Sequence, residues 1–258
     1  MPTPDGRFAS DPILSIVSPN EPCAYLPSVE SNYEIRIIAK IGDRAYDAML
    51  SRGWRRQGAY FFRPACKSCR QCKSLRVDVS AFQATKSQRR CWKRNRGIRI
   101  EIAEPSPCTE TVALFNAYHA DMTKRRGWPK NEVNLETFAT HFLIGDFSFA
   151  REFRYYQDSQ LVGIGLVDIT QQSASSIYFF HDPNWRSQGP GVFSMLAEIE
   201  HATKSRIPYH YLGYWISDCP SMSYKDRYRP NQILESYVPD ETQPVWLPHP
   251  ASDLPQYR

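Results

Sequence analysis

The amino-acid sequence predicts a mixed α/β protein of the α+β kind, with a mixed, largely antiparallel sheet. Three strand-like segments follow one another at 148–156, 161–170 and 175–181. The links between them are short and polar, which favours antiparallel hairpins. Helical segments precede this meander, and a glycine-containing turn, another helix and another strand follow it. Because the sequence predicts both helices and strands, an all-helical or an all-strand architecture is excluded.

The first hundred residues predict short strands around one basic helix. The aromatic run Tyr60–Phe62 reads as extended chain, and Pro64 ends it because proline cannot donate to a strand ladder. Gly53 fits the end of the helix before this run. The expected elements are an extended segment at 33–38, a helix at 44–51, a strand at 75–79, a basic helix from an N-cap at Ser87 to Asn95, and a strand at 98–102.

The second part begins after the segment Glu-Pro-Ser-Pro-Cys at 104–108, where we place a domain boundary. Helices are expected at 109–126 and 135–143, and after the meander a helix begins behind the turn 186–191, followed by a strand at 209–215. This order is that of a GNAT-like acyltransferase domain, preceded here by a smaller cysteine-containing amino-terminal domain. The predicted divisions are a flexible leader at 1–22, the amino-terminal domain at 23–104, the acyltransferase-like domain at 105–239 and a peripheral tail at 240–258.

Composition excludes several classes of protein. With 41% hydrophobic and 23% charged residues, and no apolar run near the ~20 residues that span a bilayer, we expect no membrane partner. The first 22 residues lack the basic start and apolar stretch of a signal peptide. Seven cysteines cannot all pair within one chain, which favours free thiols or metal ligands in the cytoplasm.

Positive charge is concentrated between residues 63 and 99. This stretch holds twelve Lys or Arg and a single acid, Asp78, whereas the whole chain carries only +5. Such a cluster predicts a polyanionic partner, nucleic acid first. A helical face that binds phosphates is expected, although a solvated charged face is the alternative. The residues expected to contact nucleic acid are Lys86, Arg89, Arg90, Lys93 and Arg94, with Trp92 either stacking on a base or anchoring the helix.

Three cysteines at three-residue steps, Cys66, Cys69 and Cys72, lie in the same stretch. Thiolates at this spacing favour a metal site, and a closed structural zinc site needs four ligands. Cys23, in another proline-flanked loop, is the best fourth ligand. Similar runs hold iron–sulfur clusters, so iron–sulfur and zinc both stay open, as do packed thiols without metal. Cys91, Cys108 and Cys219 stand singly and read as packing residues or a substrate-pocket thiol.

Two later segments carry weaker signals. The turn Ser187–Gly191 could cradle a phosphate at a helix start, but Pro190 removes one donor and an ordinary turn is the alternative. We expect no nucleotide cofactor. The aromatic and cationic segments 211–215 and 222–230 suit a pocket for a carboxylate, with Lys225 or Arg229 supplying charge, or else an ordinary sheet face with a basic rim.

Seven segments together resemble aminoacyl-tRNA–protein transferases of the arginyltransferase family. Their order and spacing are similar to the short bacterial branch, the aspartate/glutamate leucyltransferases. The segments are Cys23–Pro27, Arg52–Gly58, Arg63–Cys72, Lys86–Arg90, Phe180–Pro183, Tyr211–Ile216 and Tyr224–Pro230. Leu26 stands where eukaryotic members carry a second cysteine, so a metal site would draw on Cys66, Cys69 and Cys72.

The resemblance implies transfer of leucine from leucyl-tRNA to proteins that begin with Asp or Glu, which marks them for N-degron proteolysis. It also implies a GNAT-like catalytic domain and a metal or iron–sulfur site at the amino-terminal cysteines. Arginyl transfer from arginyl-tRNA is the first alternative. A metal-dependent tRNA-binding protein without activity is the second, and an acetyltransferase that uses acetyl-CoA is the third.

Under this reading, catalysis is mostly positioning, because an aminoacyl ester is already activated. The acidic side chain of the acceptor pairs with a cation, for which Arg55, Lys225 and Arg229 are the candidates. The expected groups that orient the acceptor amine or take its proton are Tyr178, Asp182 and Tyr214.

Overall fold

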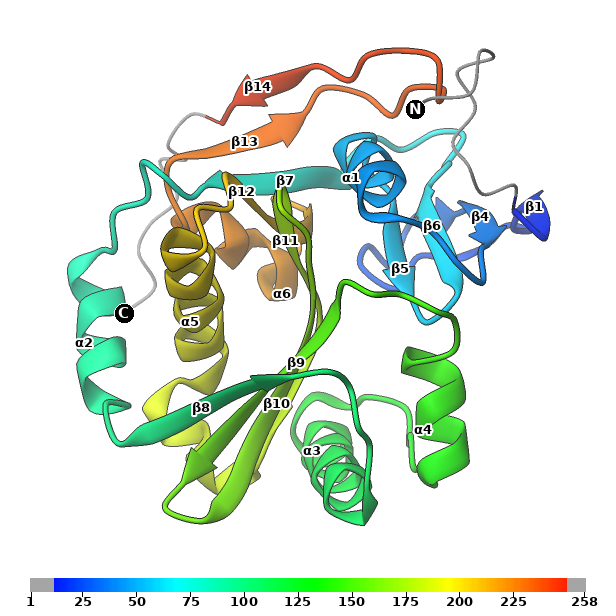
Figure 1. The fold of residues 1–258 in the computed structure, drawn as a ribbon. Helices are drawn as coiled ribbons and strands as arrows, with labels where there is room; N and C mark the ends of the chain where they lie inside the picture. Colours follow the sequence, from blue (N-terminus) through cyan, green and yellow to red (C-terminus); the bar gives the residue numbers. More distant parts are fainter. Residues whose placement is uncertain (1–11, 250–258) are drawn as a thin grey trace.

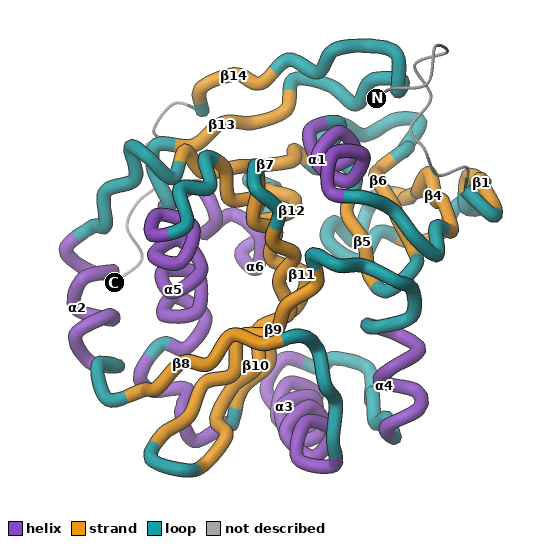
Figure 2. Tube along the Cα trace, in the orientation of Figure 1, coloured by secondary structure: helices purple, strands orange, loops and turns teal. Residues whose placement is uncertain are grey.

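The computed structural model describes residues 12–249, which are built around one eight-stranded sheet (Figures 1 and 2). All neighbouring strands are antiparallel except β11 and β12, which run parallel. The strand order is β14 (Trp246–Pro248), β13 (Asn231–Leu234), β7 (Lys73–Asp78), β12 (Tyr209–Trp215), β11 (Ser173–His181), β10 (Gln160–Ile169), β9 (Ala150–Gln157) and β8 (Ile98–Ala103). The mixed, largely antiparallel sheet predicted from the sequence is confirmed.

Helices cover both faces of this sheet (Figure 1). On β10, Leu161, Ile164 and Leu166 pack toward one face, whereas Val162 and Val167 pack toward the other. The first face meets α3 (Thr109–Arg126) and α4 (Leu135–Phe142), and the second meets α2 (Lys86–Arg94) and α5 (Pro190–Lys204). Three short helices complete this part: η1 (Pro183–Gln188), α6 (Pro220–Ser223) and η2 (Tyr224–Arg227). The predicted helices are therefore present with nearly the expected bounds.

A second, four-stranded sheet is formed by the first part of the chain. Its order is β1 (Leu14–Val17), β4 (Tyr33–Ile37), β6 (Tyr60–Pro64) and β5 (Arg55–Gln57), with β2 (Glu21–Pro22) and β3 (Glu30–Ser31) forming a separate pair. Helix α1 (Asp43–Ser51) packs on this sheet. Strand β6 ends at Pro64, as predicted.

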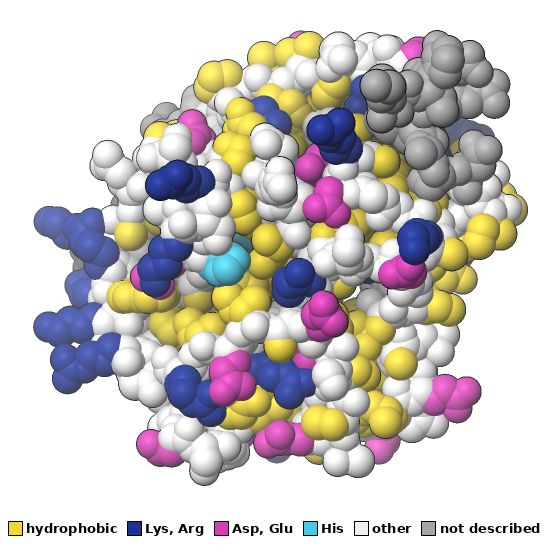
Figure 3. All heavy atoms as spheres, viewed as in Figure 1, with side chains coloured by type: hydrophobic (Ala, Val, Ile, Leu, Met, Phe, Trp, Pro, Cys, Tyr) yellow, Lys and Arg dark blue, Asp and Glu magenta, His cyan; other side chains and the backbone are white. Residues whose placement is uncertain are grey.

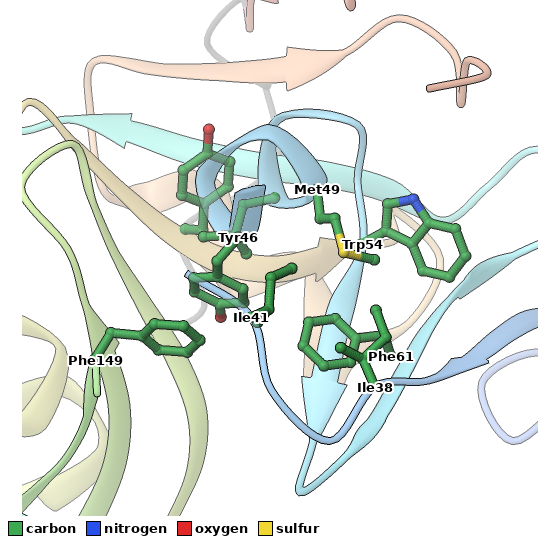
Figure 4. Close-up of a cluster of buried hydrophobic side chains, with 9 residues drawn as sticks. Ile38, Ile41, Tyr46, Met49, Trp54, Phe61 and Phe149 are labelled. Carbon is green, nitrogen blue, oxygen red and sulfur yellow. The ribbon is translucent and has the colours of Figure 1, made fainter. Parts of the chain in front are cut away.

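One hydrophobic cluster joins the two sheets (Figure 4). Tyr46 of α1 stacks on Phe149, at a ring-centroid distance of 4.1 Å, and Phe61 of β6 meets Tyr46 edge-on. Phe149 immediately precedes β9 of the large sheet. The small sheet is thus anchored at the start of the meander.

The strands on both sides of the predicted boundary near residue 104 share the large sheet. Both β7 and β8 precede that residue, yet β7 pairs with β12 and β8 pairs with β9. A local sequence pattern predicts where a strand lies but not which distant strand pairs with it. This pairing was therefore not predicted.

The predicted leader and tail lie partly outside the described residues, which exclude 1–11 and 250–258. Within the described part, the leader contributes β1 and β2. The tail contributes β14, and Trp246 donates from its indole Nε1 to the carbonyl oxygen of Ser51 at 3.0 Å. Asp240 pairs with Arg36 at 2.7 Å. These residues are therefore bound to the rest of the protein.

Helix α2 begins at a different cap from the one predicted. The N-cap is Thr85 and not Ser87, because the Thr85 side chain accepts from the Gln88 amide while the Gln88 side chain accepts from the Thr85 amide. This reciprocal box satisfies two amide groups that a serine two residues later would leave unpaired.

Among the described helices, none is long and apolar enough to cross a membrane.

Candidate functional site

The most distinctive feature of the large sheet is a split between its two parallel strands. β11 and β12 pair only through Ser173–Ser175 and Tyr209–Tyr211. Beyond these residues, β11 continues to pair with β10 and β12 with β7. The two backbones therefore separate at Ser175 and Ser176, which stand at the vertex of the split.

Two buried cations meet on one side of this vertex. Arg55 of β5 donates from Nη1 to the hydroxyl oxygen of Ser175 at 2.7 Å, and from Nη2 to the carbonyl oxygen of Ser176. Lys225 of η2 donates from Nζ to the carbonyl oxygen of Tyr214 at 2.9 Å. Gly213 lies beside both, because a Cβ atom there would come within 3.5 Å of Arg55 Nε and of Lys225 Nζ.

The electrostatics of this pair are unfavourable in the free protein. Burial, followed by the charge of Arg55, lowers the pKa of Lys225 to about 7. Across residues 12–249, no carboxylate forms an ion pair with Arg55 or Lys225. Buried cations without a counter-ion are costly, and an anionic ligand would relieve that cost. We name Arg55 and Lys225 the cation pair.

A second polar group lies on the other side of the vertex, between the sheet and α5. The Ser176 hydroxyl donates to Glu198 Oε2 and lies 3.0 Å from His210 Nε2. His210 Nε2 is also 2.9 Å from Glu198 Oε2. Glu198 and His210 are fully buried, whereas Ser176 is partly exposed. We name Ser176, Glu198 and His210 the polar triad.

Residue Ser176 connects the cation pair with the polar triad. Its carbonyl oxygen accepts from Arg55, and its hydroxyl donates to Glu198. Ser175 and Ser176 point to opposite faces because side chains alternate along a strand. The vertex is therefore positive on the face of β5 and negative on the face of α5.

Sequence reasoning missed the polar triad. Ser176 is one of three serines on β11, His210 is a lone histidine on the largely aromatic β12, and Glu198 is one acid on the buried face of α5. The only available signal was that acid, at a helical position shared with core residues such as Met195 and Ile199.

The three predicted catalytic residues are not joined by any contact within the described residues. The Tyr178 hydroxyl lies 2.9 Å from His119 Nε2, between β11 and α3. Asp182 caps η1 by accepting from the Asn184 amide at 2.8 Å. The Tyr214 hydroxyl donates to the carbonyl oxygens of Gly53 and Phe62, at 3.3 and 3.2 Å, and burial raises its pKa well above the usual value.

Of the three predicted cationic residues, two come together and one does not. Arg229 pairs with Asp226 at 3.6 Å and donates to the carbonyl oxygen of His249 at 2.8 Å. Its charge is therefore compensated where it stands. Arg55 and Lys225 form the cation pair without it.

Helix α2 presents its charges to solvent. The predicted tRNA-binding residues Lys86, Arg89, Arg90, Lys93 and Arg94 are all exposed. In Figure 3, Lys and Arg side chains gather along the left edge of the molecule, where Figure 1 places α2. The described part of the chain provides no acidic partner for any of them. Trp92 packs on Phe193 of α5 with ring centroids 5.0 Å apart, so it anchors the helix.

The predicted metal-ligating cysteines gather near the cation pair. Burial, followed by the charges of Cys23, Cys66, Cys69 and Cys219, raises the pKa of Cys72 to about 12. A hollow of about 580 Å³ opens beside this group, lined by Cys69, Asp218 and neighbouring loop residues. Yet within residues 12–249 no three His, Cys, Asp or Glu side chains are arranged to hold a metal. The thiols are neighbours but do not form a ligand set.

The turn Ser187–Gly191 packs against α2. The Asn95 side chain donates to the Gln188 carbonyl oxygen at 2.9 Å, and the Cys91 thiol lies 3.3 Å from the Gly189 carbonyl oxygen. These contacts fit the reading as an ordinary structural turn, and Cys91 is a packing residue.

Comparison with known proteins gives matches over most of the chain. The family models for arginine-tRNA-protein transferases match residues 21–90 with the amino-terminal part and 110–235 with the carboxy-terminal part. A protein of Helicobacter hepaticus named aspartate/glutamate leucyltransferase is 33% identical over 235 residues, covering 91% of this chain and 97% of the relative. One of the same name from Campylobacter jejuni (strain 81-176) is 35% identical over 213 residues, covering 83% and 89%.

Solved structures match more distantly. The L-PGS structure from Bacillus licheniformis covers 69% of this chain and 52% of its own, with 12% identity and a TM-score of 0.43. A ribosomal-protein-alanine N-acetyltransferase from Brucella melitensis covers 62% and 95%, with 14% identity and a TM-score of 0.34. At TM-scores below 0.5 these similarities carry no conclusion.

Proposed function

Because this chain belongs to the arginine-tRNA-protein transferase family, we propose that it transfers leucine from leucyl-tRNA to the α-amino group of proteins that begin with Asp or Glu. The relatives named for this activity cover most of the chain. The structural observation that carries the proposal is the cation pair, which is buried and has no counter-ion in the described residues. An acidic first residue supplies that counter-ion.

The reaction is aminolysis of an ester. The neutral α-amino nitrogen of the acceptor attacks the ester carbonyl carbon of leucyl-tRNA, and an amide bond forms. The bond between that carbon and the ribose oxygen breaks, and the ribose hydroxyl leaves with a proton. The chief task of the protein is to hold the amine a few Å from the carbonyl in the correct direction.

The cation pair binds the side-chain carboxylate of the acceptor. Arg55 is held by Ser175 and by the Ser176 carbonyl, so its guanidinium direction is fixed before the acceptor arrives. When the carboxylate enters, Lys225 gains a counter-ion. The negative charge raises the pKa of Lys225 and so opposes the effect of burial. Acceptors with neutral or basic first residues leave both cations unpaired and bind weakly.

Helix α2 binds the acceptor arm of the tRNA in this proposal. Its exposed cations Lys86, Arg89, Arg90, Lys93 and Arg94 neutralise phosphates, while Trp92 packs the helix on α5 and the Thr85 cap stabilises its first turn. Because charged tRNA is made in the cytoplasm, we place the reaction there. A leucine added to the acceptor marks it for N-degron proteolysis.

We propose separately that Cys23, Cys66, Cys69 and Cys72 hold either an iron–sulfur cluster or a zinc ion. The nearness of these thiols supports it, whereas the missing ligand arrangement speaks against a preformed site. No step above passes through a metal. Anaerobic purification followed by metal and sulfide analysis tests this proposal, and the absence of both would contradict it.

A transfer assay tests the function. Radiolabelled leucyl-tRNA and arginyl-tRNA are supplied side by side to peptides that differ only in the first residue: Asp, Glu, Asn or Lys. We expect leucine on the Asp and Glu peptides and on neither of the others. Transfer of arginine instead would make the chain an arginyltransferase, and tRNA binding without transfer would make it a binding protein.

A further inference from the structure

The hydrogen bonds of the polar triad leave one position open. A carboxylate can only accept, so His210 donates from Nε2 toward both Glu198 and Ser176, at 2.9 and 3.0 Å. The Ser176 hydroxyl donates its own hydrogen to Glu198. A hydroxyl oxygen has two acceptor positions, and His210 occupies one. The second is free to accept an N–H group from a ligand.

The three residues of the polar triad differ in how far solvent and substrate can reach them, and this difference separates their roles. Glu198 is 2% exposed and His210 is 0% exposed, so neither can meet a substrate directly. Ser176 is partly exposed and stands at the vertex of the split between β11 and β12. Ligand contact at this triad therefore goes through the Ser176 oxygen.

The vertex matches the charges of an acidic amino-terminal residue. Such a residue carries a carboxylate and an amine a few Å apart, and Ser176 contacts Arg55 of the cation pair with its carbonyl oxygen and Glu198 with its hydroxyl. A carboxylate on Arg55 and Lys225 brings the amine of the same residue toward Ser176. This match rests on the proposed function.

We infer that Ser176 is the catalytic residue that receives the proton of the acceptor α-amino group, and that Glu198 and His210 are the residues that position it and take the proton onward. One proton moves from the ammonium nitrogen to the Ser176 oxygen while the Ser176 hydrogen moves to Glu198. The free amine then attacks the ester carbonyl. After the attack, the nitrogen gives its second proton to the ribose oxygen that leaves, and the proton held on Glu198 returns through Ser176 to solvent.

The other groups that face Glu198 do not compete for this proton. They are tyrosines at positions 155, 224 and 228, from β9, η2 and the segment after it. Burial raises the pKa of each, and that of Tyr224 to about 12, so they stay neutral across the working pH range.

The test compares two neighbouring serines by steady-state transfer at saturating leucyl-tRNA. For Ser176→Ala, we expect kcat to fall about 100-fold at pH 7 with an unchanged KM for the acceptor. The defect shrinks toward pH 9, because an α-amino group with a pKa of about 7.7–8.0 then loses its proton to solvent. Ser175→Ala, which loosens Arg55, raises that KM about tenfold and leaves kcat unchanged.

Further variants separate a chemical role from a structural one. Ser176→Thr keeps a hydroxyl and should recover most of kcat, whereas Glu198→Gln keeps the shape and should repeat the pH-dependent defect. Glu200→Gln, two residues along α5 and paired with Lys204, is the matched control that changes nothing. Saturating acceptor removes the titration of Lys225 from kcat.

The outcomes distinguish this inference from the proposed function. If the unmodified protein transfers no leucine, the proposed function fails. If it transfers leucine and Ser176→Ala keeps its kcat, or loses kcat equally at every pH, the inference alone is overturned.

Discussion

Lys225 shows how one side chain links stability with binding. It is buried, it lies beside a second cation, and it has only a backbone carbonyl and the Met222 sulfur as described hydrogen-bond partners. Natural sequences rarely keep such a group without a use, because an apolar side chain would be more stable there. Its cost in the free protein is therefore evidence for an anionic ligand.

Lys225→Met should raise stability and lower affinity together. Burial lowers the pKa of Lys225 from 10.5 to about 7, so between these values the unfolded chain binds a proton that the folded chain does not. The free energy of unfolding therefore rises with pH across this window, by at most about 1.4 kcal/mol per unit. The variant should lose that slope and be more stable near pH 7, by roughly 1–3 kcal/mol.

Urea unfolding between pH 6 and 10, with the acceptor KM measured in parallel, checks this prediction. The KM of the unmodified protein should rise above pH 7 as Lys225 loses its proton. Lys225→Arg keeps its charge and should show no such rise. Equal slopes for the unmodified protein and Lys225→Met would contradict the assignment.

At the scale of single elements, α2 combines a rigid base with a charged outer face. Its cap at Thr85 and the packing of Trp92 on α5 fix one side, and five Lys or Arg side chains face solvent on the other. A helix with mixed charges would pair them internally, whereas this one leaves them available. The element is suited to bind a backbone of phosphates.

Charge reversal at Arg89 and Arg90 should weaken tRNA binding and make it less sensitive to salt. Each lost phosphate contact lowers the slope of log affinity against log salt by about 0.7–0.9. We expect a slope smaller by roughly 1–2 and an affinity at least tenfold lower in moderate salt. Filter binding at several salt concentrations measures both, with Lys204→Glu on α5 as the control; an unchanged slope would remove α2 from the interface.

Elements were more predictable from the sequence than the site they form. The strand containing Leu75 and Val77 and the helix at 109–126 follow from residue periodicity alone. The partner of β7 does not, because pairing between distant segments leaves no local pattern. The same holds for the site: Arg55 and Lys225 stood in cationic motifs and were predicted, whereas Ser176 and Glu198 belong to no sequence motif and are brought together only by the fold.

At the scale of the molecule, a buried ion pair joins the two sheets. Arg56 of β5 donates from Nε to Asp168 Oδ2 of β10 at 2.7 Å and from Nη2 to Oδ1, and the Tyr46 hydroxyl of α1 donates to the same carboxylate. Both charged side chains are almost wholly buried. Arg55 is the residue before Arg56 on β5, so its position depends on this ion pair as well.

Arg56→Met should destabilise the protein by about 3–5 kcal/mol, since it leaves the Asp168 carboxylate buried and unpaired. Adding Asp168→Asn should recover part of that loss, because the uncompensated charge is gone. Guanidinium unfolding of the two single variants and the double variant measures the coupling. Additive effects would show that the pair does not couple the sheets.

The place of β7 in the large sheet also governs when activity can begin during synthesis. This strand leaves the ribosome early, but both of its neighbours, β12 and β13, come from the last third of the chain. Until they emerge, β7 has no ladder to join, and Lys225 does not yet exist beside Arg55. A nascent chain therefore holds its basic helix long before its acceptor pocket, so an incomplete product could capture charged tRNA but could not discharge it.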